Sequence, residues 1–157
     1  MKITKNQVLN FSFLSGGFLL YSYHFFLKDK SKNAIEKYWG GITGNTRKVY
    51  IISMFLCVIS MFSLIKKIYV SKKVNYENEL YGVILLIISS MFYLPLTIQY
   101  LKKPSMIKLI NILSILFCVA LGSVVLYRLY PGVDTGYLAF HLIVLDLFYW
   151  SYNFFNF

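Results

Sequence analysis

Long apolar runs, separated by short lysine-containing segments, dominate the chain. Five runs are long enough to cross the hydrocarbon layer of a bilayer, which takes about 20 apolar residues in a helix. They cover residues 8–27, 49–65, 80–101, 109–127 and 135–156. The pattern therefore predicts an all-α protein: a polytopic integral membrane bundle of about five transmembrane helices with short loops, forming one domain over residues 1–157.

The connecting segments contain residues that end helices and residues that favour the membrane surface. Pro104 keeps the third and fourth runs from merging, because proline lacks the amide N–H that a helix interior needs. The longest connection, residues 28–48, predicts a short interfacial helix over residues 33–39 and a turn at Gly40-Gly41. Aromatic and lysine side chains are typical of the interface, and we expect membrane-interface anchors at Tyr38, Trp39, Trp150, Lys66, Lys67, Lys102 and Lys103.

The composition supports a membrane protein and argues against a nucleic-acid partner. Hydrophobic residues make up 58% of the chain and charged residues 14%, against roughly 45–50% and about 25% in soluble domains. The net charge is +10, but the lysines come as pairs between the apolar runs, without a basic stripe interleaved with aromatic residues. Lysines at helix ends attract anionic lipid headgroups, which are therefore the expected partners.

The distribution of Lys and Arg between alternate connections gives an orientation. Seven lie on the side of the N-terminus and nine on the opposite side. Because the cytoplasmic side carries the excess of positive charge, this difference of two residues favours an N-terminus outside but is too small to decide the orientation. It does not indicate which cellular or viral membrane contains the protein.

Polar residues inside the apolar runs are the candidates for a functional site. Helices in lipid contact one another through small residues and interhelical hydrogen bonds, and each run carries such a stripe at helical spacing. The midpoints of the runs form a layer of small or polar residues that contains one carboxylate, Asp146. The candidate intramembrane polar site comprises Asp146, Tyr149, Asn153, His24, Asn10, Ser89 and Ser90.

Asp146 is the residue whose environment separates the functional alternatives. An unpaired charge at the bilayer centre costs at least about 2.5–3.5 kcal/mol, so we expect Asp146 to be protonated and hydrogen-bonded to Ser or Tyr. It is either a functional proton or cation site or a neutral group that joins helices. His141 lies five residues earlier, about 140° around an α-helix, so the two side chains are not expected to pair.

Residue spacing gives no support for a metal, a cofactor or an enzyme. His24 and His141 are expected to differ in depth by about 17 Å, too far to share one iron. Cys57 and Cys118 have no ligand cluster at matching spacing, and no catalytic motif or paired carboxylates occur. We expect no metal site, no cofactor and no enzymatic activity.

Three classes of function remain. The first expectation is a non-enzymatic structural, scaffold or assembly component of a cellular or viral membrane. One alternative is a small proton- or cation-linked transporter or channel that uses Asp146, and the other is a lipid-binding or lipid-modifying membrane protein. Because one bundle of five helices encloses little volume, we expect the first two classes to form a homo- or hetero-oligomer.

Overall fold

The computed structural model describes residues 2–28 and 30–156, and all regular secondary structure in these residues is helical. The elements are α1 (Lys5–Leu27), α2 (Lys32–Tyr38), α3 (Gly44–Val70), α4 (Glu77–Val83), η1 (Ile84–Ile88), α5 (Ser89–Lys102), α6 (Met106–Leu129), α7 (Val133–Phe140), η2 (His141–Trp150) and α8 (Ser151–Asn156). The segments η1 and η2 are π-helical. They lie inside two continuous helices that cover Glu77–Lys102 and Val133–Asn156.

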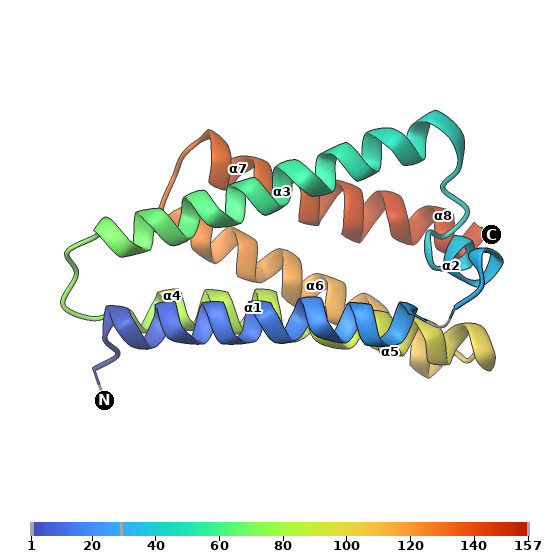
Figure 1. The fold of residues 1–157 in the computed structure, drawn as a ribbon, viewed down its shortest axis with the longest axis horizontal. Coiled ribbons are helices and arrows are strands. Elements are labelled where there is room, and N and C mark those ends of the chain that lie inside the picture. Colours follow the sequence, from blue (N-terminus) through green and yellow to red (C-terminus); the bar gives the residue numbers. More distant parts are fainter. Residues whose placement is uncertain (1, 29, 157) are drawn as a thin grey trace.

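The long helices run in alternate directions along the bundle (Figure 1). α1, the helix 77–102 and the helix 133–156 run one way, and α3 and α6 run the other way. The N-terminus and the turns at 71–76 and 130–132 lie at one end, which we call the N-terminal end. α2, the turn at 103–105 and the C-terminus lie at the other, which we call the α2 end.

Four helices of the described residues are long and apolar enough to cross a membrane. They are Gly44–Val70, Glu77–Lys102, Met106–Leu129 and Val133–Asn156. Four of the expected spans are therefore present as apolar helices, and the expected count of about five is approximate. The first expected span is the 23-residue α1, which lies beside the others but carries polar residues such as Asn10, Ser12 and His24 that lower its hydropathy.

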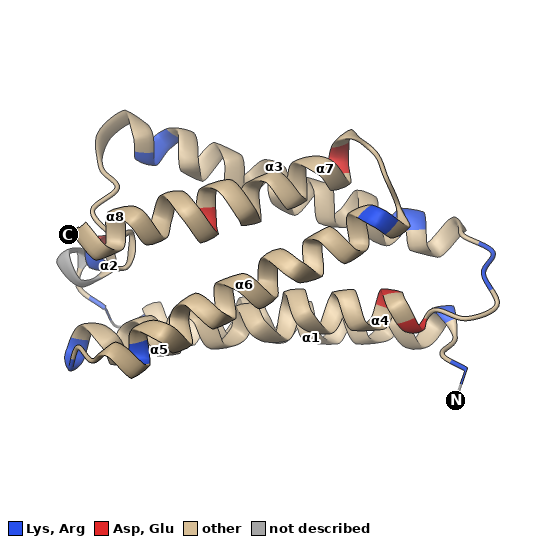
Figure 2. Cartoon of the chain, turned by 180° about the vertical axis from the view of Figure 1, so that it is seen from behind, with Lys and Arg blue, Asp and Glu red and all other residues tan. Residues whose placement is uncertain are grey.

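Large apolar side chains cover the outside of the bundle. On α1, Phe13, Leu14 and Phe18 are each more than half exposed, and Phe55 and Ile59 are equally exposed on α3. Patches of this extent are rare on soluble monomers. Figure 2 shows that Lys and Arg gather at the two ends of the bundle and leave its middle free. An apolar belt between two basic rims is the surface expected of a bundle that crosses a bilayer.

Local sequence signals explain where several helices begin. Thr4 caps α1, accepting from the Gln7 amide, while the Gln7 side chain accepts from the Thr4 amide. Ser105 caps α6 through a single bond, its hydroxyl oxygen accepting from the Lys108 amide. The predicted turn before α3 is present at Gly40 and Gly41, whose φ angles of 59° and 74° favour glycine.

The N-terminal end is held by ion pairs and hydrogen bonds of polar side chains, among which Glu79 is buried. Glu79 is 1% exposed, and its carboxylate accepts from the Lys73 ammonium at 2.6 Å and from the Tyr130 hydroxyl at 2.9 Å. A second ion pair joins Lys67 to Asp134 at 2.6 Å. Each pair links two helices or a helix and its preceding turn, so these contacts fix the helix ends opposite to α2.

Candidate functional site

Asp146 lies in η2, a ten-residue π-helical segment near the middle of the helix 133–156. π-Helices bond residue i to residue i+5; they are rare, and they occur frequently at functional sites. The Tyr50 hydroxyl, from α3, donates a hydrogen bond to Asp146 Oδ1. The expected hydrogen bond between Asp146 and a tyrosine or serine is therefore present.

His141 also contacts Asp146, which corrects the expectation that the two would not pair. The imidazole Nε2 lies 3.6 Å from Asp146 Oδ1. The expectation assumed 3.6 residues per turn throughout, whereas the wider turn of η2 brings residues five apart nearly above one another. The two side chains consequently lie on the same face of their helix.

A chain of polar side chains continues from His141 across the interface with α3. His141 Nδ1 lies 2.8 Å from Ser53 Oγ, and Ser53 Oγ lies 2.6 Å from the Tyr137 hydroxyl. His141 is 2% exposed and Ser53 is 5% exposed. Because buried polar groups must be hydrogen-bonded, this set of contacts orders the interface of α3 with α7 and η2. We call Tyr50, Asp146, His141, Ser53 and Tyr137 the polar chain.

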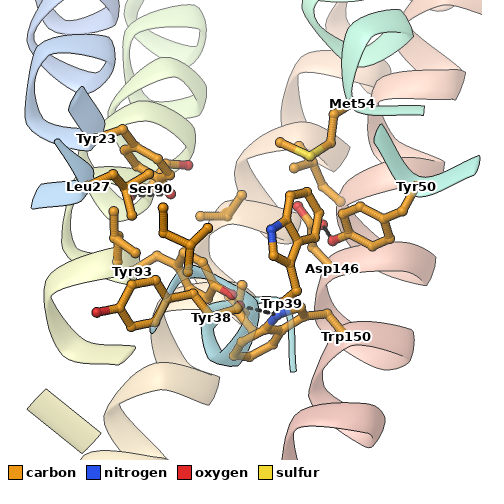
Figure 3. Close-up of a pocket in the computed structure, with 15 residues that line it drawn as sticks. Tyr23, Leu27, Tyr38, Trp39, Tyr50, Met54, Ser90, Tyr93, Asp146 and Trp150 are labelled. Atoms are coloured by element: carbon orange, nitrogen blue, oxygen red, sulfur yellow. Dashed lines mark hydrogen bonds between the residues drawn. The ribbon is translucent and has the colours of Figure 1, made fainter. Parts of the chain in front are cut away.

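One side of the polar chain opens on a pocket of about 270 Å³ (Figure 3). Small-molecule sites typically hold about 300–1,000 Å³, so this pocket suits a compact ligand or one end of a longer one. In Figure 3, side chains from α1 and α5 stand on one side and Tyr50, Met54 and Asp146 stand on the other. Its wall comprises Tyr23, Leu27, Ile35, Tyr38, Trp39, Tyr50, Met54, Ser90, Tyr93, Leu94, Leu116, Val119, Leu142, Asp146 and Trp150.

Aromatic contacts place α2 over the pocket at the α2 end. The Trp150 indole N–H donates to the Tyr38 carbonyl at 3.1 Å. Trp39 meets the Tyr50 ring edge to face, with centroids 5.8 Å apart, and the Arg47 guanidinium lies 4.9 Å from the Trp39 ring centre. These contacts tie the connection between α1 and α3 to the site, so that it forms part of the pocket wall.

Both α1 and α3 contribute residues to the pocket wall. The two helices are joined at the N-terminal end, where the Lys5 ammonium donates to the Tyr69 carbonyl at 2.8 Å. They diverge toward the α2 end (Figure 1), and α1 contributes Tyr23 and Leu27 to the pocket wall while α3 contributes Tyr50 and Met54. Met54, on α3, lines the pocket and is 41% exposed on the apolar surface of the bundle.

The electrostatics of the pocket favour a cation. Asp146 is the only charged side chain among the described residues that line it. The Tyr50 hydroxyl and the His141 imidazole both contact Asp146 at Oδ1, and the Asp146 side chain keeps 24% of its surface accessible. Aromatic faces are negative, and six aromatic residues line the same space. The described residues contain no cluster of three or more His, Cys, Asp or Glu that could hold a metal ion.

The structure brings some of the predicted site residues together and places others elsewhere. Asp146 and Ser90 line the pocket. The remaining predicted members lie outside it: His24, Asn10 and Tyr149 are exposed, and Ser89 and Asn153 are half-buried.

Three residues predicted as interface anchors, Tyr38, Trp39 and Trp150, line the pocket. Trp150 is only 3% exposed, so its indole packs inside the bundle and does not lie on the outer surface. The lysine pairs 66–67 and 102–103 lie near the helix ends.

Tyrosines form the part of the site that sequence reasoning missed. Tyr50 bonds to Asp146, and Tyr23 and Tyr93 line the opposite wall. The available signal was the spacing of Tyr50, Ser53 and Cys57, which places two hydroxyl groups and a thiol on one helical face of a long apolar run.

Comparisons with protein-family models, with curated proteins and with solved structures found no match to this chain.

Proposed function

We propose that this chain is a multi-pass membrane protein that binds a small organic cation with an apolar body. The cationic group lies against Asp146 Oδ2, and the apolar body lies among the aromatic side chains of the pocket. The observation that carries the proposal is the placement of one accessible carboxylate in the wall of an otherwise apolar and aromatic pocket.

When Asp146 is ionised, the site is more stable with a bound cation than without one. An unpaired carboxylate at this depth costs at least about 2.5–3.5 kcal/mol, and a bound cation removes this cost. A contact between a cation and an aromatic face contributes about 0.5–1 kcal/mol when exposed and about 2 kcal/mol when desolvated, and tryptophan is the strongest partner. Trp39 and Trp150 both line the pocket, on the same side of it as Asp146 in Figure 3.

The pocket supports this function over a structural or assembly role. A carboxylate that only joins helices needs no accessible oxygen, and protein interiors contain few voids larger than a water molecule. Here Asp146 is bonded on one oxygen and borders about 270 Å³ of space. This combination supports the cation-linked alternative over a scaffold. We propose that the ligand enters beside Met54, which lines the pocket and is 41% exposed.

The test uses benzyltrimethylammonium and its neutral carbon isostere, neopentylbenzene, with the purified protein in phosphatidylglycerol nanodiscs. The chain has only two tryptophans and both line the pocket, so tryptophan emission reports its occupancy. We expect saturable binding of the cation and at least about tenfold weaker binding of the isostere, a difference of 1.4 kcal/mol. Asp146→Asn should weaken cation binding by a similar factor.

Asp134→Asn is the matched control, since it removes a carboxylate that pairs with Lys67 at the N-terminal end, away from the pocket. It should leave cation binding unchanged. Equal binding of the cation and the isostere, or unchanged cation binding in Asp146→Asn, would refute the proposal. Repeating the titration in nanodiscs with the same share of phosphatidylglycerol and either phosphatidylcholine or phosphatidylethanolamine as the second lipid distinguishes the source of the ligand. Because the surface charge is then equal, weaker binding beside phosphatidylcholine would identify lipid trimethylammonium headgroups as competitors.

A further inference from the structure

Three members of the polar chain, His141, Ser53 and Tyr137, lie outside the pocket wall and have no part in the proposed function. His141 Nδ1 lies 2.8 Å from Ser53 Oγ, and this oxygen lies 2.6 Å from the Tyr137 hydroxyl. On the other side of the imidazole, Nε2 lies 3.6 Å from Asp146 Oδ1. The direction of these hydrogen bonds therefore decides which form of the Asp146 carboxyl group the chain favours.

We propose that the other members of the polar chain hold Asp146 as the ionised carboxylate that the cation needs. Tyr137 is the first donor of the chain, and the last is the Nε2–H of His141, which faces Asp146 Oδ1. This inference rests on the proposed function of the pocket. Ser53 and Tyr137 are then positioning residues, which touch no ligand and act on the cation site through the imidazole.

The hydrogens of the polar chain favour this direction over the reverse one. A neutral imidazole has one N–H, so one nitrogen donates and the other accepts. With the Nε2–H facing the carboxylate, the Tyr137 hydroxyl donates to Ser53 and the Ser53 hydroxyl donates to Nδ1, so each hydrogen points at an acceptor. In the reverse direction, a protonated Asp146 faces Nε2, the Nδ1–H donates to Ser53, and Ser53 donates to Tyr137. The phenolic hydrogen then has no acceptor among the described residues.

The two directions therefore differ by one hydrogen bond, the one that Tyr137 donates. A typical hydrogen bond inside a protein shifts an equilibrium by about threefold to tenfold. We expect the polar chain to favour the ionised form of Asp146 by a factor of this size. Removing the Tyr137 hydroxyl should abolish the preference, because Ser53 can then bond to the imidazole in either direction.

A second donor meets the same oxygen of Asp146 from α3. The Tyr50 hydroxyl donates to Oδ1, the atom that the imidazole Nε2 approaches. Hydrogen bonds to a carboxylate favour its charged form. The two donors hold the carboxyl group at Oδ1, and the proposed function assigns Oδ2 to the cation.

The other titratable groups around Asp146 are hydroxyl groups and a thiol, which ordinarily carry no charge at neutral pH. They are Tyr23 of α1, Tyr38 of α2, Tyr50 and Cys57 of α3 and Tyr93 of α5. The pocket residues from α6, Leu116 and Val119, are apolar. His141 is the one described neighbour in this set that can become a cation near neutral pH, so the test includes a variant without the imidazole.

The experiment measures the Kd of benzyltrimethylammonium by tryptophan emission across a range of pH, in the same phosphatidylglycerol nanodiscs. Because the charge of this probe is fixed, only the protein titrates. Wild-type affinity should be constant at high pH and should fall by about tenfold per pH unit below a midpoint, as Asp146 takes up a proton. Tyr137→Phe and Ser53→Ala should move this midpoint to higher pH, with about threefold to tenfold weaker binding below it and the same Kd at high pH.

His141→Gln tests whether Tyr137 acts through the imidazole. The glutamine amide can still present an N–H to Asp146, but it has no second ring nitrogen for Ser53. Adding Tyr137→Phe to His141→Gln should therefore leave the midpoint where His141→Gln alone places it. A shift of the same size with and without the imidazole would overturn the inference.

Ser60→Ala is the matched control, because Ser60 is a buried serine of α3 whose hydroxyl bonds to the Leu56 carbonyl of its own helix. It should keep the wild-type midpoint and the wild-type Kd at high pH. An unchanged profile in Tyr137→Phe would overturn the inference, and so would equal weakening at every pH, which a merely structural role would cause. In both cases the binding function stands, whereas absence of cation binding to the wild type at every pH would refute the proposed function itself.

Discussion

Gly122 lies where α6 crosses the helix 77–102 at its π-helical segment, and Gly122→Ala is expected to force the two helices apart. A Cβ atom at this position would lie 2.7 Å from Leu86 N, 2.8 Å from Gly82 O and 3.0 Å from Leu85 Cβ. Two of these atoms belong to the backbone, so no side-chain rotation relieves the contact. Close approach of this kind is how membrane helices gain packing energy.

The loss of stability expected for Gly122→Ala follows from these distances. To reach ordinary contact at about 3.4 Å, the two backbones must separate by about 0.7 Å. Inserting one methyl group into a packed interior typically costs about 1–3 kcal/mol. We expect Gly122→Ala to lower the free energy of unfolding by this amount. Both helices contribute to the pocket wall, so cation affinity should fall as well.

Reversible SDS titration, followed by tryptophan emission in mixed micelles, measures this loss. Gly16→Ala is the matched control, because it makes the same change in a long helix where no atom lies within 4 Å of the added Cβ. It should leave stability unchanged or raise it by about 0.5–1 kcal/mol, the usual preference of a helix for alanine over glycine. Equal effects of the two substitutions would show that the helices do not meet at Gly122.

Three further predictions concern the ends of the bundle. Tyr130→Phe removes the hydroxyl that donates to the buried Glu79 and should cost about 1.5–3 kcal/mol in the same titration, with Glu79→Gln reducing the effect. Burial lowers the pKa of the Lys73 ammonium, but its hydrogen bond and ion pair with Glu79 outweigh this and raise that pKa above 10.5. The stability that the Lys73–Glu79 pair contributes is therefore complete below the unfolded pKa of Lys73, about 10.4, and is lost as the pH rises through its folded pKa. The melting temperature of the wild type should therefore fall more steeply at alkaline pH than that of Glu79→Gln. Cysteine variants at Asn45 and Glu77 should react with an impermeant maleimide from opposite sides of the membrane, and reaction from one side would refute the alternating arrangement.

The sequence predicted the helices because each apolar run is long and is bounded by charges or proline. The boundaries were less accurate, since the second run, residues 49–65, forms the longer helix Gly44–Val70. Helices continue past the apolar run because lysines such as Lys66 and Lys67 can keep their stems along the helix while their charges reach water. The polarity of α1 was visible in the sequence, although its position beside the other helices required the structure.

The site was predicted only in part, for two physical reasons. Asp146 and Ser90 were found because depth follows from position along a helix. The pairing of His141 with Asp146 depends on the π-helical geometry of η2, which a repeat of 3.6 residues cannot reveal. The partnership of Tyr50 with Asp146 depends on how α3 packs, and no spacing within one helix contains that information.

The most direct test of the central claim, that a cation binds between Asp146 and the two tryptophans, is a benzyltrimethylammonium titration of single-tryptophan proteins. Trp39→Phe and Trp150→Phe each leave one indole in the pocket wall. The account predicts that both proteins report saturable binding, each weaker than in the wild type because one indole is lost, and that adding Asp146→Asn to either weakens this binding by a further factor of at least about ten. Emission that does not change with the cation in either protein, or the same Kd with and without Asp146→Asn, would contradict it.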